Sequence, residues 1–381
     1  MKLFTTPWAW MGLIAALALS SCGGGVGTGG TGGFASGPIT GFGSVIVGGV
    51  RFDDSTAEVE DLDGLRRSRD DLRLGMTVEI DSSAIAADAT ASASHIRFES
   101  ELQGPVGLVN VLDSSFTMLG QRVTVDATTV FDERLAGGLA GLATGQPVEV
   151  YAVFDAAAQR YRATRVEPAP AGAVLRLRGP LAEVNTNTQT LRVGGASYEY
   201  VGAAGVPAGL AAGQYVRLRL ELELAPARWV VRSFAAALQP LPDRDGIRLE
   251  GLVTAVGVGG NFIVNGRPVD ASGLVVPGLA LGVRVEVEGN IRNGVVRATK
   301  VEVKSDDDVR DRGFELQGPI ASVDAAQGSF VVRGLTVGTS RPDLRFENGS
   351  AANLVAGRVV EVRAQLAADR RSLEATRIRF R

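Results

Sequence analysis

Two residue types that carry much of enzyme chemistry occur once each in this chain of 381 residues: Cys22 and His95. A zinc site built from cysteine and histidine needs several such ligands, and an internal disulfide needs two cysteines. A Ser-His-Asp triad would have to use His95. His95 lies in Ala93-Ser94-His95-Ile96, which has the pattern of a strand. We therefore expect a solvated strand position there, and a protein that is not an enzyme and needs no metal or cofactor.

Carboxylates recur along the chain, and paired carboxylates can perform acid-base catalysis. Each of four glutamates stands between two apolar residues of a Val-Glu-(Val/Ile) segment: Glu79, Glu149, Glu286 and Glu361. Because they belong to different copies of a repeat described below, we expect them on the solvated face of a strand and not at a shared site.

An acidic run, Asp306-Asp307-Asp308 followed by Asp311, is the segment closest to a calcium-binding pattern. It lacks the alternating aspartates and the glycine of an EF-hand loop. We interpret it as an acidic linker.

Aromatic rings, on which sugars and nucleobases stack, are concentrated in one stretch. Tyr198 and Tyr200 are two residues apart, so they share a face of a strand, and Trp229 follows. These three residues are the candidate ligand-binding site. In the alternative, the rings fill a core that Phe fills in other copies. Burial of both tyrosines against Leu191 and Val193 would favour that alternative.

The charge balance gives no sign of a nucleic-acid partner. Lys and Arg number 39 against 42 Asp and Glu, a formal net charge of −3. A nucleic-acid surface needs clustered positive charge. Hydrophobic residues make up 45% of the chain, which is enough to form folded cores.

The N-terminus has the pattern of a bacterial export signal. Lys2 precedes an apolar run from Trp8 to Leu19, short for a membrane span, and Leu19-Ser20-Ser21-Cys22 follows. This resembles the lipobox of bacterial lipoproteins. The resemblance implies a signal peptide over 1–21, lipid attachment at Cys22 and, with Gly23 next, sorting to the outer membrane. We expect a protein of the cell envelope anchored by that lipid.

Residues 22–36 predict a tether. From Gly23 to Gly33 the sequence consists of Gly, Thr and Val, and such a segment cannot bury a core.

The rest of the chain repeats itself five times. A Leu-x-x-Gly motif followed by an alternating apolar strand has its glycine at Gly75, Gly145, Gly213, Gly282 and Gly357. A second glycine opens each copy: Gly37, Gly104, Gly179, Gly251 and Gly318. The copies define modules over 37–103, 104–172, 173–244, 245–313 and 314–381. The glycine of Leu-x-x-Gly stands just before a strand, where we predict a positive φ.

Within each copy the apolar period is two, the pattern of half-buried strands. We count five strands per copy, with a short helical turn before the fourth, for example at 135–142. A small sheet with one apolar face must curl to cover its edges. We therefore predict an all-β protein of five tandem, five-stranded, OB-like barrels, with small β-sandwiches as the alternative.

The lipobox, the Gly-rich segment and the tandem copies resemble bacterial lipoproteins that carry the domain of unknown function numbered 5666. The shared pattern includes Phe-x-Val-x-Gly and Leu-x-x-Gly-x-x-Val-Glu-Val, and the resemblance covers residues 37–381. It implies β-barrel modules and export, and no activity. The third copy departs from the pattern, with Arg217 in place of Glu and Val231 and Phe234 in its last strand.

Two functions fit these observations. The first is a structural or protein-interaction role for the lipid-anchored modules, with an envelope protein or polymer as the unidentified partner. The second is a lipoprotein that holds a glycan or a small anionic molecule in the third module. Equivalent surfaces on all modules would favour the first, and an aromatic cleft in one module the second.

Overall fold

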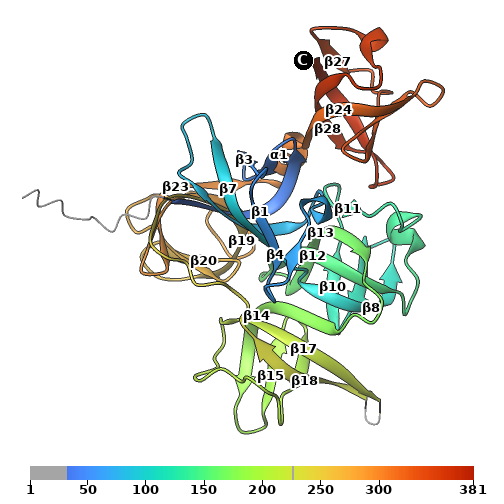
Figure 1. The fold of residues 1–381 in the computed structure, drawn as a ribbon. Helices are drawn as coiled ribbons and strands as arrows, with labels where there is room; N and C mark the ends of the chain where they lie inside the picture. Colours follow the sequence, from blue (N-terminus) through green and yellow to red (C-terminus); the bar gives the residue numbers. More distant parts are fainter. Residues whose placement is uncertain (1–31, 225–226) are drawn as a thin grey trace, which may run out of the picture.

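The structure is a computed structural model in which residues 32–224 and 227–381 are described (Figure 1). The described residues form 29 strands, three short 3-10 helices and one α-helix. The predicted all-β class is confirmed. Among these residues, no helix is both long and apolar enough to cross a membrane.

The first module is a closed barrel. Its strands are β1 (Gly32–Phe42), β2 (Val45–Val47), β3 (Val50–Asp53), β6 (Thr77–Ser83) and β7 (Thr90–Phe98). Strands β1, β2 and β3 form an antiparallel meander, and β3 pairs in parallel with β7. Strand β7 then pairs with β6, and β6 closes the ring on β1. A five-stranded barrel with this order has the topology of an OB-fold.

Four more barrels close in the same order. Barrel 2 contains β8 (Leu102–Asn110), β9 (Ser115–Met118), β10 (Gln121–Thr124), β12 (Pro147–Asp155) and β13 (Arg160–Pro168). Barrel 3 contains β14 (Leu175–Asn185), β15 (Thr190–Val193), β16 (Ala196–Glu199), β17 (Tyr215–Leu224) and β18 (Ala227–Ala235). Barrel 4 contains β19 (Arg244–Val256), β20 (Asn261–Val264), β21 (Arg267–Asp270), β22 (Arg284–Arg292) and β23 (Val295–Lys304). Barrel 5 contains β24 (Phe314–Asp324), β25 (Ser329–Val332), β26 (Leu335–Gly338), β28 (Val359–Leu366) and β29 (Leu373–Phe380). The predicted set of five small barrels is confirmed.

Short elements complete three of the barrels. A 3-10 turn precedes the fourth strand in barrels 1, 2 and 5: η1 (Arg69–Asp71), η2 (Gly138–Gly141) and η3 (Ala351–Asn353). Short strands lie in the same connections: β4 (Glu58–Asp61), β5 (Arg66–Arg67), β11 (Val130–Phe131) and β27 (Arg345–Glu347). The predicted helical turn is therefore present in three of the copies.

The acidic run links barrels 4 and 5, and it is helical. It forms helix α1 (Asp306–Arg312) between barrels 4 and 5. The Ser305 hydroxyl accepts the backbone N–H of Asp308, and the Asp308 carboxylate accepts the N–H of Ser305, which is a capping box. Aspartates in the first turn also suit the positive end of the helix dipole.

The glycine of Leu-x-x-Gly closes each barrel. Its φ is +82°, +84°, +86°, +79° and +83° in the successive copies, which confirms the predicted left-handed conformation. In each copy its N–H donates to a carbonyl of the first strand, for example Gly145 to Val106 at 2.7 Å and Gly357 to Ile320 at 2.8 Å. The turn thus brings the fourth strand onto the first.

Strand β1 lies at the centre of the molecule. Besides its own barrel, it pairs in parallel with β19 of barrel 4 and with β24 of barrel 5. Figure 1 shows the blue barrel 1 between the orange barrel 4 and the green barrel 2. The sequence analysis placed residues 32–36 in the tether, but they belong to this strand. They pair with β6, and the side chains of Phe34 and Ala35 are buried.

Candidate functional site

The outer faces of the barrels carry one equivalent charged position each. The residue before the first-strand glycine pairs with the charged residue of the fourth strand. The pairs are Ser36 with Glu79, Gln103 with Glu149, Arg178 with Arg217, Glu250 with Glu286, and Gln317 with Glu361. Since side chains alternate along a strand, these residues point away from the barrel interiors.

This charged face is not solvated, so the prediction from the sequence was wrong on that point. Glu79, Arg217 and Glu361 are buried, and Glu149 and Glu286 are half-buried. In barrels 1 and 3 a neighbouring barrel or connecting segment covers the position, and in barrel 5 its own arginines cover Glu361.

The junction of barrels 1 and 4 contains a buried ion pair. Arg267 Nη2 donates to Glu79 Oε1 at 2.6 Å, and the two side chains are 7% and 10% exposed. The same guanidinium lies 5.8 Å from the ring centre of Phe34, a cation–π contact. Nearby, Arg244 pairs with Asp81 at 2.8 Å. The two barrels are therefore joined by charge as well as by strand pairing.

The departure of the third copy has a structural reason. Arg217 pairs with Asp63 of barrel 1 and, at 3.1 Å, with Glu99 of the segment that follows β7. Arg176 approaches Glu99 at 2.8 Å. Burial raises the pKa of Glu99, and the two arginines oppose that shift. A glutamate at position 217 would meet two carboxylates, so arginine is the complementary choice.

Two carboxyl groups, the buried Glu101 and the half-buried Glu149, lie where barrels 1, 2 and 3 meet. Glu101 accepts the N–H of Ala152 at 2.9 Å and faces Arg178 at 3.0 Å. Burial nevertheless raises the pKa of Glu101 to about 7. Burial, followed by the charge of Glu167 on the next strand, raises the pKa of Glu149 to about 7 as well. Both groups therefore titrate near neutral pH.

A small cavity of about 40 Å³ lies within this network, next to Glu79, Glu101, Arg178 and Arg267. A cavity needs about 10–15 Å³ for each water molecule, so this space fits a few waters and no metabolite. The network is suited to joining barrels.

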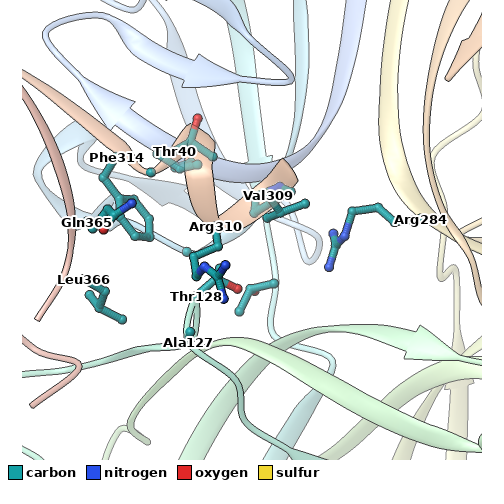
Figure 2. Close-up of a pocket in the computed structure, with 14 residues that line it drawn as sticks. Thr40, Ala127, Thr128, Arg284, Val309, Arg310, Phe314, Gln365 and Leu366 are labelled. Atoms are coloured by element: carbon teal, nitrogen blue, oxygen red, sulfur yellow. The ribbon is translucent and has the colours of Figure 1, made fainter. Parts of the chain in front are cut away.

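A larger cavity of about 100 Å³ lies where α1 meets barrels 1, 2, 4 and 5 (Figure 2). Thr40 of β1, Thr128 of barrel 2, Arg284 of barrel 4 and Gln365 of barrel 5 all line it. No local sequence pattern predicts this cavity, because its walls come from segments distant in the chain.

The candidate aromatic site is largely core. Tyr198 is 1% exposed, and its hydroxyl donates to Leu119 O at 2.7 Å and accepts from Gln121 Nε2 at 2.6 Å. Burial raises the pKa of Tyr198. Tyr200 is 4% exposed, and its ring meets that of Phe234 edge to face. Trp229 is half-buried against the same core.

Tyr198 and Tyr200 lie in one hydrophobic cluster with Leu191 and Val193, the arrangement stated above as favouring a core role. The two tyrosines therefore do not line an open groove. Tyr198 instead connects barrel 3 to barrel 2 through Leu119 and Gln121.

The remaining candidates do not form a catalytic cluster. His95 is half-exposed, and its Nε2 lies 3.3 Å from Oε2 of Glu58, which is itself 50% exposed. Across the described ranges, no three His, Cys, Asp or Glu side chains are placed to hold a metal ion. Cys22 lies outside the described residues.

These features define a protein of tandem OB-like barrels joined through their charged faces. Three segments match the family model described as "Domain of unknown function (DUF5666)": residues 103–167, 250–302 and 317–379. They coincide with barrels 2, 4 and 5, so the chain carries tandem repeats similar to that domain. No curated protein matches the sequence significantly.

Among solved structures, "drosophila Unr CSD456" aligns with 47% of this chain and 88% of its own, at 13% identity and a TM-score of 0.16.

Proposed function

We propose that this chain is a lipid-anchored protein of the bacterial cell envelope in which five barrels serve together as a structural, protein-interaction unit without catalysis. The observation that carries the proposal is the use of the charged faces. In barrels 1 and 3 these faces contact neighbouring barrels, as in the buried Glu79–Arg267 pair, and the charged groups are not gathered in a shared catalytic cleft. The surfaces that remain available to other molecules are the loops that point outward from the barrels.

The lipid on Cys22 would hold barrel 1 close to a membrane. Strand β1 begins at Gly32, ten residues after Cys22 (32 − 22). A fully extended chain spans about 3.3–3.6 Å per residue, so the separation is at most about 36 Å. Since β1 also pairs with barrels 4 and 5, anchoring this strand would anchor the other barrels with it.

Apolar loop tips support a protein partner. In barrel 2, the connection from β8 to β9 exposes Val111 at 55% and Leu112 at 99%, and Leu108 near the end of β8 is 72% exposed. In barrel 4, the equivalent connection exposes Val258 at 89%, and Val256, the last residue of β19, is 50% exposed. This loop is one of those with which OB-folds usually contact their ligands. Clustered exposed apolar side chains are typical of interaction sites.

Recovery of partners from native envelopes tests the proposal. We expect the full-length protein to enter the detergent phase and to retain defined proteins after purification. Cys22→Ala should leave the detergent phase. Leu112→Asp combined with Val258→Asp should lose those proteins without a change in melting temperature.

The matched control is Val201→Asp, at an apolar residue of barrel 3 that is 56% exposed and outside these loops. It should retain the same proteins. Detergent partition of Cys22→Ala like that of the wild type contradicts the anchoring. Equal recovery by the loop variant and the control contradicts the role of the loops.

A further inference from the structure

Arg284 is a buried cation without a hydrogen-bonded partner. Its side chain, at the start of β22, is 5% exposed, and its Nε is fully covered. Among the described residues no acceptor lies within hydrogen-bonding distance of Nε, and the nearest carboxylate oxygen is Glu250 Oε1, 3.7 Å from Nη1. That oxygen is also buried without a hydrogen bond.

A second arginine of the same barrel makes hydrogen bonds that Arg284 lacks, although its Nε is also buried without a partner. Arg267 is equally buried, and it donates to Glu79 at 2.6 Å and to the carbonyl of Gln239 at 2.5 Å. Buried guanidinium groups are normally paired in this way, because removing an unpaired charge from water is costly. Burial accordingly lowers the pKa of Arg284. Arg284 thus has donor capacity that the protein itself does not use.

The unused donors belong to the wall of the 100 Å³ cavity. Thr164, on another wall, has a buried hydroxyl that also has no hydrogen-bonding partner. Figure 2 shows Arg284 on one side of the cavity and Phe314 and Leu366 on the opposite side. Arg310 and Gln365 also line the cavity, so its walls combine a buried cation on one side with apolar side chains and an amide on the other.

The size of the cavity limits the occupant. Its 100 Å³ are several times the roughly 10–15 Å³ that a single water molecule requires. A molecule of several non-hydrogen atoms fits, whereas an oligosaccharide or a nucleotide does not.

We propose that this cavity binds a small carboxylate with a short apolar body. The carboxylate would accept hydrogen bonds from the Arg284 guanidinium, whose planar donors match its two oxygens. Thr164 would donate to it as well. The apolar body would lie toward Phe314 and Leu366. Glu250 does not prevent this, because its other oxygen is already paired with Arg312 at 2.8 Å.

Such a ligand would touch three barrels at once, through Arg284 of barrel 4, Thr164 of barrel 2, and Phe314 and Leu366 of barrel 5. The cavity walls come from barrels 1, 2, 4 and 5 and from α1, between the last two. A ligand that binds only when these walls are assembled stabilises the assembled state by mass action. The site is thus a means by which a small carboxylate fixes the arrangement of the barrels. This goes beyond the proposed envelope role and does not depend on it.

Calorimetric titration of the full chain in detergent with butyrate tests the proposal. We expect saturable binding and a rise in melting temperature. Arg284→Gln should weaken binding by roughly tenfold or more and abolish the rise. Since Arg284 Nε makes no hydrogen bond and Glu250 keeps its pair with Arg312, this variant should fold without ligand about as stably as the wild type. Arg66→Gln, at a residue 81% exposed, is the matched control and should bind like the wild type.

Two further measurements make the result decisive. Thr164→Val keeps the side-chain shape, and we expect it to fold and to weaken butyrate binding even if Arg284→Gln fails to fold. Inorganic phosphate, which has no apolar body, should bind the wild type at least roughly tenfold more weakly than butyrate. No butyrate binding by the wild type, unchanged binding by a folded Arg284→Gln or Thr164→Val variant, or a preference for phosphate overturns the proposal.

Discussion

Arg267 and Glu79, which are 188 positions apart in the chain, form an ion pair across the junction of barrels 4 and 1, with 2.6 Å between Nη2 and Oε1. Arg267 Nε and Glu79 Oε2 are buried without hydrogen bonds, so the pair is only partly satisfied. Its contribution to the assembly therefore depends on both partners being present.

Removing one partner should cost much more than removing both. We expect Glu79→Gln to destabilise the junction by about 3–5 kcal/mol, because it leaves the Arg267 charge buried and uncompensated. Glu79→Leu combined with Arg267→Leu should cost far less. Thermal unfolding of the three proteins measures this.

The control for this pair is Glu58→Gln, which breaks the exposed pair with Arg66 and should cost at most about 1 kcal/mol. A double variant as unstable as Glu79→Gln would show that packing, and not charge, holds the junction.

Ionisation of Glu149 should lower the free energy of unfolding as the pH rises through neutrality. Its pKa is about 7 in the folded protein against 4.5 for the unperturbed group. Between these values the folded state binds more protons than the unfolded state, so stability decreases with pH there. The favourable term is fully present below about pH 4.5 and is lost as the pH passes 7. Glu101 acts in the same direction.

Glu149→Gln should flatten this dependence and stabilise the protein at pH 8 by on the order of 2 kcal/mol. Melting temperatures between pH 5 and 8 measure the effect. Glu183→Gln, at a side chain 72% exposed, serves as the control and should leave the slope unchanged. An unchanged slope in Glu149→Gln would exclude this residue as its source.

The fold was predictable from the sequence because alternation and glycine placement are local signals. Leu-x-x-Gly showed where the fourth strand begins, and the positive φ of Gly213 and its counterparts followed. The junctions were not predictable. A period of two shows that Arg217 points outward, but not that Asp63, 154 residues earlier, covers it. The Gly-rich start of β1 had no alternation to identify it as a strand.

The same limit applies to the candidate sites. Proximity in the sequence grouped Tyr198 with Tyr200, but only the folded chain shows that Tyr198 bonds to Leu119 of another barrel. The isolated position of Arg284 is visible only once the surrounding barrels are in place. In both cases the decisive neighbour lies in a different repeat.

Tyr198→Phe should weaken the junction of barrels 2 and 3. The change deletes the hydroxyl that bonds Leu119 and Gln121 and leaves the Gln121 amide buried with one partner fewer. We expect a loss of about 1–3 kcal/mol by chemical unfolding. Tyr200→Phe is the control, since among the described residues no hydrogen bond to the Tyr200 hydroxyl occurs. Equal effects of the two changes would contradict a role for the Tyr198 hydroxyl.

Substitutions at Gly145 and Gly282 distinguish the free-energy cost of a left-handed backbone from that of a steric clash. Both have a positive φ, of +84° and +79°. A Cβ on Gly145 would meet nothing within 4 Å, whereas one on Gly282 would lie 2.7 Å from the Cβ of Ala157 in barrel 2. Gly145→Ala should therefore cost about 1 kcal/mol from backbone strain alone. Gly282→Ala should cost more, and Gly282→Val about 1–3 kcal/mol or above, because barrel 2 must also move away.

Thermal unfolding of the three variants tests the order. If Gly282→Ala is no worse than Gly145→Ala, then barrels 2 and 4 are not in close contact at this turn. If neither alanine variant is destabilised, the positive φ is not what the repeated glycine provides.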